Sequence, residues 1–528
     1  MQDHSENTKR IAKNTLMLYG RMLFSMVVSL YTSRVVLNTL GVEDYGIYNV
    51  VGGFVAMFSL ISSSLSSSVS RFLTFELGKG DMERLKRVFS TSLIIHIGLA
   101  LIVLIAAETI GLWFVNHKLV IPPERLYAAN WVFQASIVSF CFGLLSTPYN
   151  ASIISHEHMG TFAYIGILDT CLRLAIVLFI AHSPWLFDRL IVYSLLLVAV
   201  SISLQCIYLY YCRKHFEECR IRLVWDKQCV KKMGSFAGWN FIGCTAGLLK
   251  DQGVNILLNL TFGPIVNAAR GIASTVNGAV GGFAGNFMTA LNPQITKSFA
   301  ANDKRYYFSL VERGSRFSFY IMFLFALPLC LETEFVLTLW LKQYPAHTIN
   351  FVRLVLILSL SDILSNTLIT LQSATGKIRN YQLAVGGTLL LNFPLSYLAL
   401  KLGCAPESTL IVAIFISVYC MVLRLLFLQK TIGFSICSFF KNVYLNVICV
   451  AILSSIIPFA THHFMGYGWP RFITTCLVCF VCGTIVILFV GCSRYERLFI
   501  FRKTPFARTG HQKGKQSQQT QTDIHLNK

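Results

Sequence analysis

Long apolar segments recur along the chain and leave little room for any other kind of structure. Fourteen of them approach the roughly 20 residues that cross a bilayer as a helix. Only 13% of the 528 residues are charged and 55% are hydrophobic, a composition that excludes a soluble globular protein. The sequence therefore predicts an all-α polytopic membrane protein. The expected spans are 12–34, 45–68, 90–115, 128–151, 161–182, 189–211, 236–260, 264–290, 317–340, 351–372, 381–402, 407–428, 442–464 and 471–492.

The distribution of basic residues predicts the orientation of these spans. With the N-terminus in the cytoplasm, the inner segments hold 32 of the 45 Lys and Arg residues and the outer segments hold 8. Such a bias is typical of cytoplasmic loops. We therefore expect a multi-pass plasma membrane protein with both termini in the cytoplasm. The net charge of +21 is explained by these loops and by contact with anionic lipid at the cytoplasmic face, so we expect no nucleic-acid partner.

A weak internal repeat predicts two lobes. Residues 37–41 (LNTLG) resemble residues 258–263 (LNLTFG), with six spans between the two copies. An even number of spans gives both copies the same orientation, so the expected architecture is two parallel six-helix lobes plus a C-terminal helix pair. Chance similarity between two membrane hairpins is the alternative. The expected divisions are a cytoplasmic N-terminal tail (1–11), an N-lobe (12–211), a basic cytoplasmic inter-lobe loop (212–235), a C-lobe (236–428), two additional helices (429–492) and a basic, disordered cytoplasmic tail (493–528).

Three basic side chains inside predicted spans are the main candidates for function: Arg21, Lys250 and Arg270. A charge at mid-bilayer costs about 2.5–3.5 kcal/mol on insertion scales, so it usually faces a cavity or a partner. Several cations around one polar cavity suit a multiply charged anion such as a pyrophosphate. The alternative is structural: Lys250 neutralised by a carboxylate, and Arg21 extending to the membrane surface.

Polar residues share helix faces with these cations and are expected to line the same cavity. They are Asn14, Ser25, Ser29, Asn240, Asn255, Asn267, Ser274 and Asn277. Three intramembrane acids are candidates for proton or sodium coupling, namely Asp251, Asp362 and Glu108. Asp169 and Arg173 are four residues apart and are expected to pair with each other.

Other motifs give no chemistry. His156-Glu157-His158 lacks the spacing of a metal site, so we read it as a loop and expect no metal. No phosphate-binding glycine motif is present, and no loop could hold a catalytic domain. We therefore expect neither a cofactor nor enzymatic activity. Seven serines between Ser62 and Ser70 could line a vestibule or allow close helix packing.

Two short motifs resemble those of a known family. Residues 39–48 read TLGVEDYGIY and residues 71–81 read RFLTFELGKGD. With the span count, they make the chain similar to the Wzx-type polysaccharide repeat-unit flippases of the multidrug/oligosaccharidyl-lipid/polysaccharide (MOP) superfamily. The resemblance implies an inner-membrane carrier that moves undecaprenyl-pyrophosphate-linked oligosaccharides to the outer leaflet by alternating access, for O-antigen (lipopolysaccharide) or capsule biosynthesis. It also implies a polysaccharide polymerase and glycosyltransferases as partners, and Arg21, Lys250 and Arg270 as the cations of its cavity.

Two relatives with the same fold remain as alternatives. One is a cation-coupled multidrug exporter, which uses membrane carboxylates on its first and seventh helices; here the first span carries Arg21 and no acid. The other is a flippase for the lipid-linked peptidoglycan precursor, which the sequence separates poorly from a repeat-unit flippase.

Overall fold

Helices account for nearly all of the structure. The computed structural model describes residues 2–56, 58–117, 119, 121–182, 188–220, 224–494 and 496–497, and these ranges contain no strand. The first part of the chain forms α1 (Gln2–Ala56), α2 (Ser59–Lys79), α3 (Met82–Ala106), α4 (Leu112–His117), α5 (Leu126–Ser155), α6 (Met159–His182) and α7 (Arg189–His215).

The second part begins with two long helices and continues with shorter ones. It comprises α8 (Lys227–Phe262), α9 (Pro264–Ala300), α10 (Lys304–Leu331), α11 (Thr333–Leu341), α12 (Thr348–Ile363), α13 (Asn366–Thr375), α14 (Arg379–Leu390), α15 (Asn392–Lys401), α16 (Ser408–Ile432), α17 (Ile436–Phe439), α18 (Asn446–Phe464) and α19 (Trp469–Val486). Short π-helical segments, η1 (Ala107–Gly111), η4 (Phe440–Leu445) and η5 (Ile487–Gly491), continue α3, α17 and α19, and 3-10 turns form η2 (Pro123–Arg125) and η3 (Glu217–Cys219).

Eleven helical stretches within the described residues are long and apolar enough to cross a membrane. α2, α8 and α9 are not among them, because serine, glycine and asparagine lower their hydropathy. α8 and α9 are nevertheless continuous helices of 36 and 37 residues. The protein is therefore an all-α, multi-pass membrane protein, and the count of fourteen spans stays a prediction.

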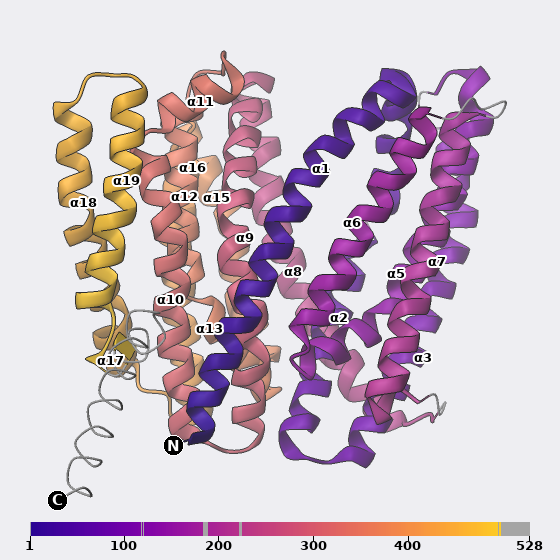
Figure 1. Cartoon of the computed structure of the whole chain (residues 1–528), viewed down its shortest axis with the longest axis horizontal. Coiled ribbons are helices and arrows are strands. Elements are labelled where there is room, and N and C mark those ends of the chain that lie inside the picture. The colour runs from indigo at the N-terminus through magenta and orange to yellow at the C-terminus, as the bar shows by residue number, and fades with distance from the viewer. Residues whose placement is uncertain are drawn as a thin grey trace, which may run out of the picture.

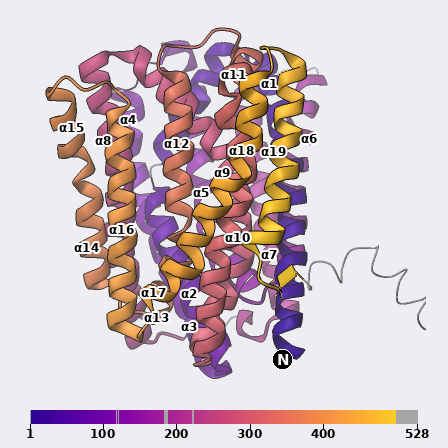
Figure 2. The same cartoon turned by 90° about the vertical axis from the view of Figure 1, so that its left-hand side faces the viewer.

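The helices form two bundles (Figure 1). α2, α3, α5, α6 and α7 pack together in the first, and α1 runs diagonally beside them. α9, α10, α12, α13 and α16 form the centre of the second, with α18 and α19 packed together at its outer edge. Figure 2 shows the second bundle from the front, with α13, α14 and α17 towards the end that holds the N-terminus. We call this end the N-terminal face.

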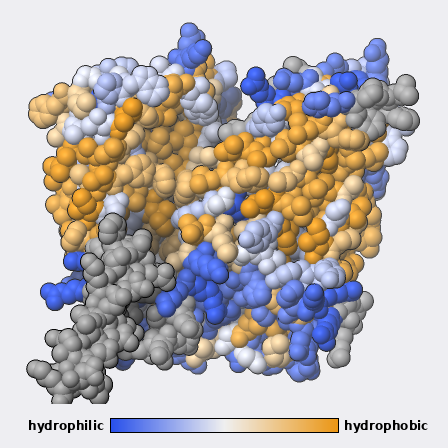
Figure 3. Space-filling model, in the orientation of Figure 1, coloured by the Kyte–Doolittle hydropathy of each residue, from blue (hydrophilic) through white to orange (hydrophobic). Residues whose placement is uncertain are grey.

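The two bundles meet at the N-terminal face and separate towards the other end. α2 packs on α8 and α9, and the start of α1 packs on the second half of α9. The space-filling view shows an apolar belt across the face in view and a notch between the two halves at the end opposite the N-terminus (Figure 3). The bundles are thus closed at one end and apart at the other.

Several predicted boundaries are wrong in detail. The expected tail 1–11 is helical from Gln2, and Gly41 breaks α1 with a φ of 83° that favours glycine. The expected span 45–68 is interrupted before α2 begins at Ser59. The inter-lobe loop 212–235 is shorter than expected, because α7 continues to His215 and Asp226 caps the start of α8 at Lys227. Residues 498–528 of the expected tail lie outside the described residues.

Candidate functional site

A buried carboxylate joins the two bundles at the N-terminal face. Glu157 lies in the turn between α5 and α6, and its side chain is 2% exposed. Lys297 of α9 donates through Nζ to Glu157 Oε1 at 2.6 Å, and Gln294 Nε2 donates to Oε2 at 2.5 Å. Arg10 of α1 adds a guanidinium nitrogen 3.6 Å from Oε2. A buried carboxylate needs such partners, so this network holds α1, α9 and the α5–α6 turn together.

α2 closes the same face through hydrogen bonds to α8 and α13. Ser64 and Ser68 are buried, and their hydroxyls donate to the α8 carbonyls of Ala237 at 2.6 Å and Met233 at 3.1 Å. Arg71 donates to the last carbonyls of α13, those of Ser373 (3.3 Å) and Ala374 (2.9 Å). Ser64 and Ser68 therefore allow close packing of α2 on α8, whereas a vestibule lined by the other serines stays a prediction.

Arg21 lies just above this closed region, between α1, α6 and α9. Its Nη2 donates to Asn286 Oδ1 of α9 at 3.4 Å, and its guanidinium carbon is 4.4 Å from the centre of the Phe162 ring. Gly166 leaves room for it, because a Cβ there would lie 2.8 Å from Arg21 Cδ. In the part of the chain that the structure describes, no carboxylate pairs with Arg21. Its contacts are neutral, which leaves the positive charge available to an anion.

α9 carries a stripe of buried polar atoms without partners nearer the open end. Asn267 Oδ1, Arg270 Nη1 and Asn277 Oδ1 have no hydrogen-bond partner among the described residues, and their spacing puts them on one face of the helix. The acid of α8 that acts electrostatically on Arg270 is Asp251. Unpartnered buried groups are rare and costly, so a stripe of three is a candidate contact surface for a polar ligand or water.

The structure does not bring the three predicted cations into one cluster. Counted from the turn at Gly263, Arg270 lies ~10 Å along α9, Lys250 ~20 Å along α8, and Asn286, the partner of Arg21, ~35 Å along α9. Lys250 is 9% exposed. Lys250 acts electrostatically on Cys420 of α16, which places it on the second-bundle side of α8. The cations are therefore spread over the depth of the membrane.

Most of the other predicted residues have protein partners. Asn14 donates to the carbonyl of Glu157 at 3.3 Å, and Ser25 shares a hydrogen bond with Thr170 of α6 at 3.0 Å. Asn240 accepts from Gln382 at 3.4 Å, and Asn255 donates to Gln252 at 3.3 Å. Ser29 and Ser274 are exposed.

The predicted acids differ in their surroundings. Asp169 pairs with Arg173, whose Nε is 2.8 Å from Oδ1. Asp362 accepts a hydrogen bond from Ser417 of α16. Glu108 is exposed on η1, where it accepts from Gln134 at 3.0 Å. Asp251 is exposed near Arg270. Asp251 thus acts on a predicted cation of the α8–α9 hairpin, and Asp362 and Lys250 both act on Cys420 of α16.

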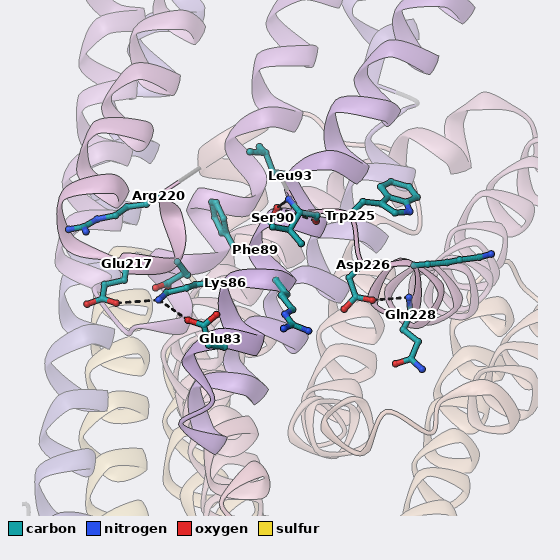
Figure 4. A pocket seen from close by; sticks show the side chains of 14 residues that line it. Glu83, Lys86, Phe89, Ser90, Leu93, Glu217, Arg220, Trp225, Asp226 and Gln228 are labelled. Atoms are coloured by element: carbon teal, nitrogen blue, oxygen red, sulfur yellow. Dashed lines mark hydrogen bonds and ion pairs between the residues drawn. The ribbon is translucent and has the colours of Figure 1, made fainter. Parts of the chain in front are cut away.

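A pocket of about 710 Å³ lies between α3 and the connector from α7 to α8 (Figure 4). Lys86 lies between Glu83, 3.2 Å away, and Glu217, 3.7 Å away, while Ser90 donates to the carbonyl of Val224. Asp226 caps the next helix by accepting from Gln228 N at 2.9 Å. Positive and negative side chains pair with each other here, and these contacts hold the connector against α3.

Comparison with known proteins identifies the family. The family described as polysaccharide biosynthesis protein matches residues 9–301, more than half of the 528 residues. The chain belongs to this family. No curated protein sequence matches this polysaccharide biosynthesis protein. The matched region ends within the turn after α9, so it contains the first bundle, the Glu157 network and the α9 stripe.

Solved structures similar to the chain include MATE transporters and a MOP superfamily transporter. A Vibrio cholerae MATE transporter, crystallised as a point mutant, has a TM-score of 0.68 at 16% identity, over 82% of this chain and 100% of its own. A MOP superfamily transporter from Pyrococcus furiosus has a TM-score of 0.66 at 13% identity, over 80% and 95%. A MATE transporter in the straight conformation reaches 0.67 at 12% identity, over 80% and 96%. These matches establish that the chain has a MATE-like fold.

Sequence reasoning missed Glu157, Gln294 and Lys297. The partners of Glu157 on α9 lie 137 and 140 residues away, so no local pattern pointed to them. Glu157 stands between two histidines, and this motif was considered only as a possible metal site. One signal was available: Glu157 is the single acid in a predicted inner loop, residues 152–160, that contains no Lys or Arg.

Proposed function

We propose that the chain is a flippase for lipid-linked oligosaccharides. It carries undecaprenyl-pyrophosphate-linked repeat units from the cytoplasmic to the outer leaflet of a bacterial inner membrane, for the synthesis of a surface polysaccharide such as O-antigen or capsule. Its family and its transporter fold support the general class. The N-terminal face is taken as cytoplasmic because it collects the basic loops.

One observation carries the choice of substrate. Arg21 and Arg270 lie on α1 and α9, at the boundary between the bundles, and the hydrogen bonds and ring contacts described for them involve no carboxylate. Cations without a hydrogen-bonded carboxylate attract a multiply charged anion, although Asp251 lies in the electrostatic field of Arg270, and each charge-assisted hydrogen bond contributes about 1.5–3 kcal/mol. A diphosphate that links a sugar to a lipid is such an anion.

The depth of these cations suggests two positions for the diphosphate. Arg21 borders the closed N-terminal face, whereas Arg270 and the α9 stripe lie ~24 Å further along α9. A single diphosphate is too small to touch both. The head group is therefore bound first near Arg21, when the N-terminal face is open, and later near Arg270, when the opposite end is open. Lys250 lies between them in depth.

A multidrug exporter of the same fold is the less favoured function. Such an exporter takes cationic drugs and needs unpaired carboxylates in its cavity. Here α1 presents Arg21 instead of an acid, and Asp251, the exposed acid of α8, lies in the field of Arg270. The polarity of the site can differ within the superfamily: the Pyrococcus furiosus structure is described as having a binding pocket of reversed polarity that suggests a different function.

Substitution of the two arginines tests this function. Arg21→Ala or Arg270→Ala is expected to lower the flipping rate of a lipid-linked diphosphate oligosaccharide in proteoliposomes by about 10- to 100-fold, the loss of one charge-assisted bond. Lys at either position keeps the charge and is expected to restore part of the rate. Arg173→Ala is the control, because Arg173 is already paired with Asp169.

Surface polysaccharide in cells that carry each variant gives a second readout, with membrane abundance of the protein measured beside it. Normal flipping and normal polysaccharide from the Arg21→Ala/Arg270→Ala double variant would overturn the proposal.

A further inference from the structure

A second pocket opens at the N-terminal face, away from the boundary residues described above. It has a volume of about 1260 Å³ and lies between the end of α2, the start of α8, the α13–α14 turn and the end of α16. Figure 2 shows α13, α14 and α16 ending near this face. Six cationic side chains line it and no acidic one does: Arg71, Lys231, Lys232, Lys377, Arg379 and Lys430.

This charge distribution differs from that of the other two pockets described. The pocket at the α7–α8 connector contains Glu83 and Glu217, and one beside α17 contains Glu312 and Glu496. In both, cations pair with these acids, as Lys86 does with Glu217 and Arg316 with Glu496. Cationic side chains that line a pocket without an acid repel one another. An anion bound among them removes this repulsion and stabilises the folded protein.

Five of the six cations are exposed and available. Arg71 forms the inner wall and already donates to the α13 carbonyls. Within the described ranges, the other five form no ion pair with a carboxylate. They come from three elements, the start of α8, the α13–α14 turn and the end of α16, so they surround the pocket instead of extending along one helix. This arrangement suits an anion with more than one charged group.

Aromatic and aliphatic side chains next to the cations point to a lipid and not to a free anion. Arg379 stacks over the Trp239 ring at 5.2 Å, and Trp is typical of the membrane–water interface. Leu383 of α14 and Leu426 of α16 are exposed one helical turn from Arg379 and Lys430, on the membrane side. A head group held by the cations would therefore place its chains on an apolar helix surface.

We propose that this pocket binds the head group of a lipid that carries two phosphates. Two lipids share this chemistry: a membrane phospholipid with two phosphates, such as cardiolipin, and the prenyl diphosphate of the substrate lipid. Binding of the first stands on the pocket alone, whereas binding of the second makes the pocket a loading site and rests on the proposed function. In both cases the lipid ties the end of α2 to α8, α14 and α16.

Lipid binding by the purified full-length protein tests the proposal. The probes are cardiolipin, undecaprenyl diphosphate and phosphatidylglycerol in phosphatidylcholine vesicles at matched phosphate content, and inorganic pyrophosphate in solution. The variant Lys232→Gln/Arg379→Gln/Lys430→Gln removes three exposed cations of the pocket. The matched control, Arg87→Gln/Arg220→Gln/Lys227→Gln, removes three cations from the connector pocket at the same face.

The expected result is tighter binding of one or both two-phosphate lipids than of phosphatidylglycerol. The pocket variant is expected to bind them about 100-fold more weakly, and the control variant as tightly as the unchanged protein. Preference for undecaprenyl diphosphate alone supports the loading site, and equal binding of cardiolipin supports a membrane-lipid site. Equal loss in both variants, equal binding of phosphatidylglycerol, or pyrophosphate binding as tight as that of the lipids would overturn the proposal.

This assay measures binding and not transport. A failure here therefore leaves the Arg21 and Arg270 experiment unaffected, and a failure of that experiment leaves a membrane-lipid site unaffected. An intact thermal unfolding transition in both triple variants shows that they are folded, as expected for exposed side chains.

Discussion

Glu157 is the residue on which the closed N-terminal face depends most directly. It stands at a left-handed φ of 62°, which costs a non-glycine residue about 1 kcal/mol or more. The surrounding contacts maintain this conformation, since Lys297, Gln294 and Arg10 all reach its carboxylate. A strained turn held by an ion pair across two bundles has the features of a latch that opens when the bundles separate.

Neutralising this carboxylate is expected to loosen the latch. Glu157→Gln keeps a hydrogen-bonding group but removes the charge that Lys297 faces, which costs about 2 kcal/mol and raises the open population ~30-fold. Hydrogen–deuterium exchange is expected to increase in α2 and in the second half of α9. Glu83→Gln removes an exposed acid from the same face and serves as the control. Unchanged exchange in both variants would show that the network does not hold the bundles together.

His158, next to Glu157, gives the N-terminal face a pH dependence. Burial and the positive charges of His156, His215, Lys297 and Arg10 lower the pKa of His158 below its usual 6.5. The unfolded chain therefore binds the proton more readily, so stability is complete above about pH 6.5 and declines as the pH falls through the lower, folded-state pKa.

Thermal unfolding measured from pH 8 to pH 5 tests this effect. The unfolding midpoint of the unchanged protein is expected to fall as the pH is lowered. In His158→Asn this fall is expected to be smaller by about a degree or two, a small effect because the His158 side chain is largely exposed. An acid-induced fall of the same size in both proteins would exclude His158 as the cause.

At the scale of helices, α2 and α9 approach most closely at Gly78. A Cβ on Gly78 would lie 2.7 Å from Lys297 Cα, 2.8 Å from its carbonyl oxygen and 2.9 Å from Ala300 Cβ. Backbone atoms cannot move aside as a flexible side chain can, so an added methyl group must push the two helices apart. This contact needs glycine for its size, since Gly78 lies inside a regular helix.

Gly78→Ala is therefore expected to destabilise the closed face although alanine favours helices. Gly98→Ala is the matched control, because Gly98 lies in α3 with no atom within 4 Å of an added Cβ. That change is expected to be neutral or to stabilise the helix by about 0.5–1 kcal/mol. Thermal unfolding distinguishes the two, and an equal rise in the midpoint for both variants would contradict the close approach.

Sequence reasoning predicted the helices better than their interruptions and their depths. Hydropathy placed most spans within a few residues, and helical phase put Asn267, Arg270 and Asn277 on one face of α9. Hydropathy does not reveal where a helix is interrupted within an apolar segment. Two such interruptions were missed, one before Ser59 and one at Leu364 and Ser365 between α12 and α13. Phase also gives direction but not depth, so Arg21 and Arg270 were expected to lie together. The partners of Glu157 depend on how the bundles dock, which no local pattern encodes.

At the scale of the whole molecule, the described contacts between bundles fall in one half. They involve Met233 and Ala237 on α8, Gly282 to Lys297 on α9, and the end of α13. The first half of α9 and most of α8 extend beyond them, towards the notch in Figure 3. Under the proposed function, alternating access requires these contacts to break while others form at the opposite end.

A covalent link across the closed face is expected to stop transport without harming the fold. Ser64 Oγ lies 2.6 Å from the Ala237 carbonyl oxygen, so the two backbones are close and cysteines introduced at both positions are expected to lie within reach of a short, reducible thiol cross-linker. Each cross-linked molecule keeps its N-terminal face shut, and flipping in proteoliposomes is expected to fall in proportion to the cross-linked fraction and to recover on reduction. The single variants Ser64→Cys and Ala237→Cys, treated in the same way, control for the sixteen native cysteines. Full transport by the cross-linked double variant would mean that the bundles need not separate at α2 and α8, and that the carrier works by a smaller motion than rocking.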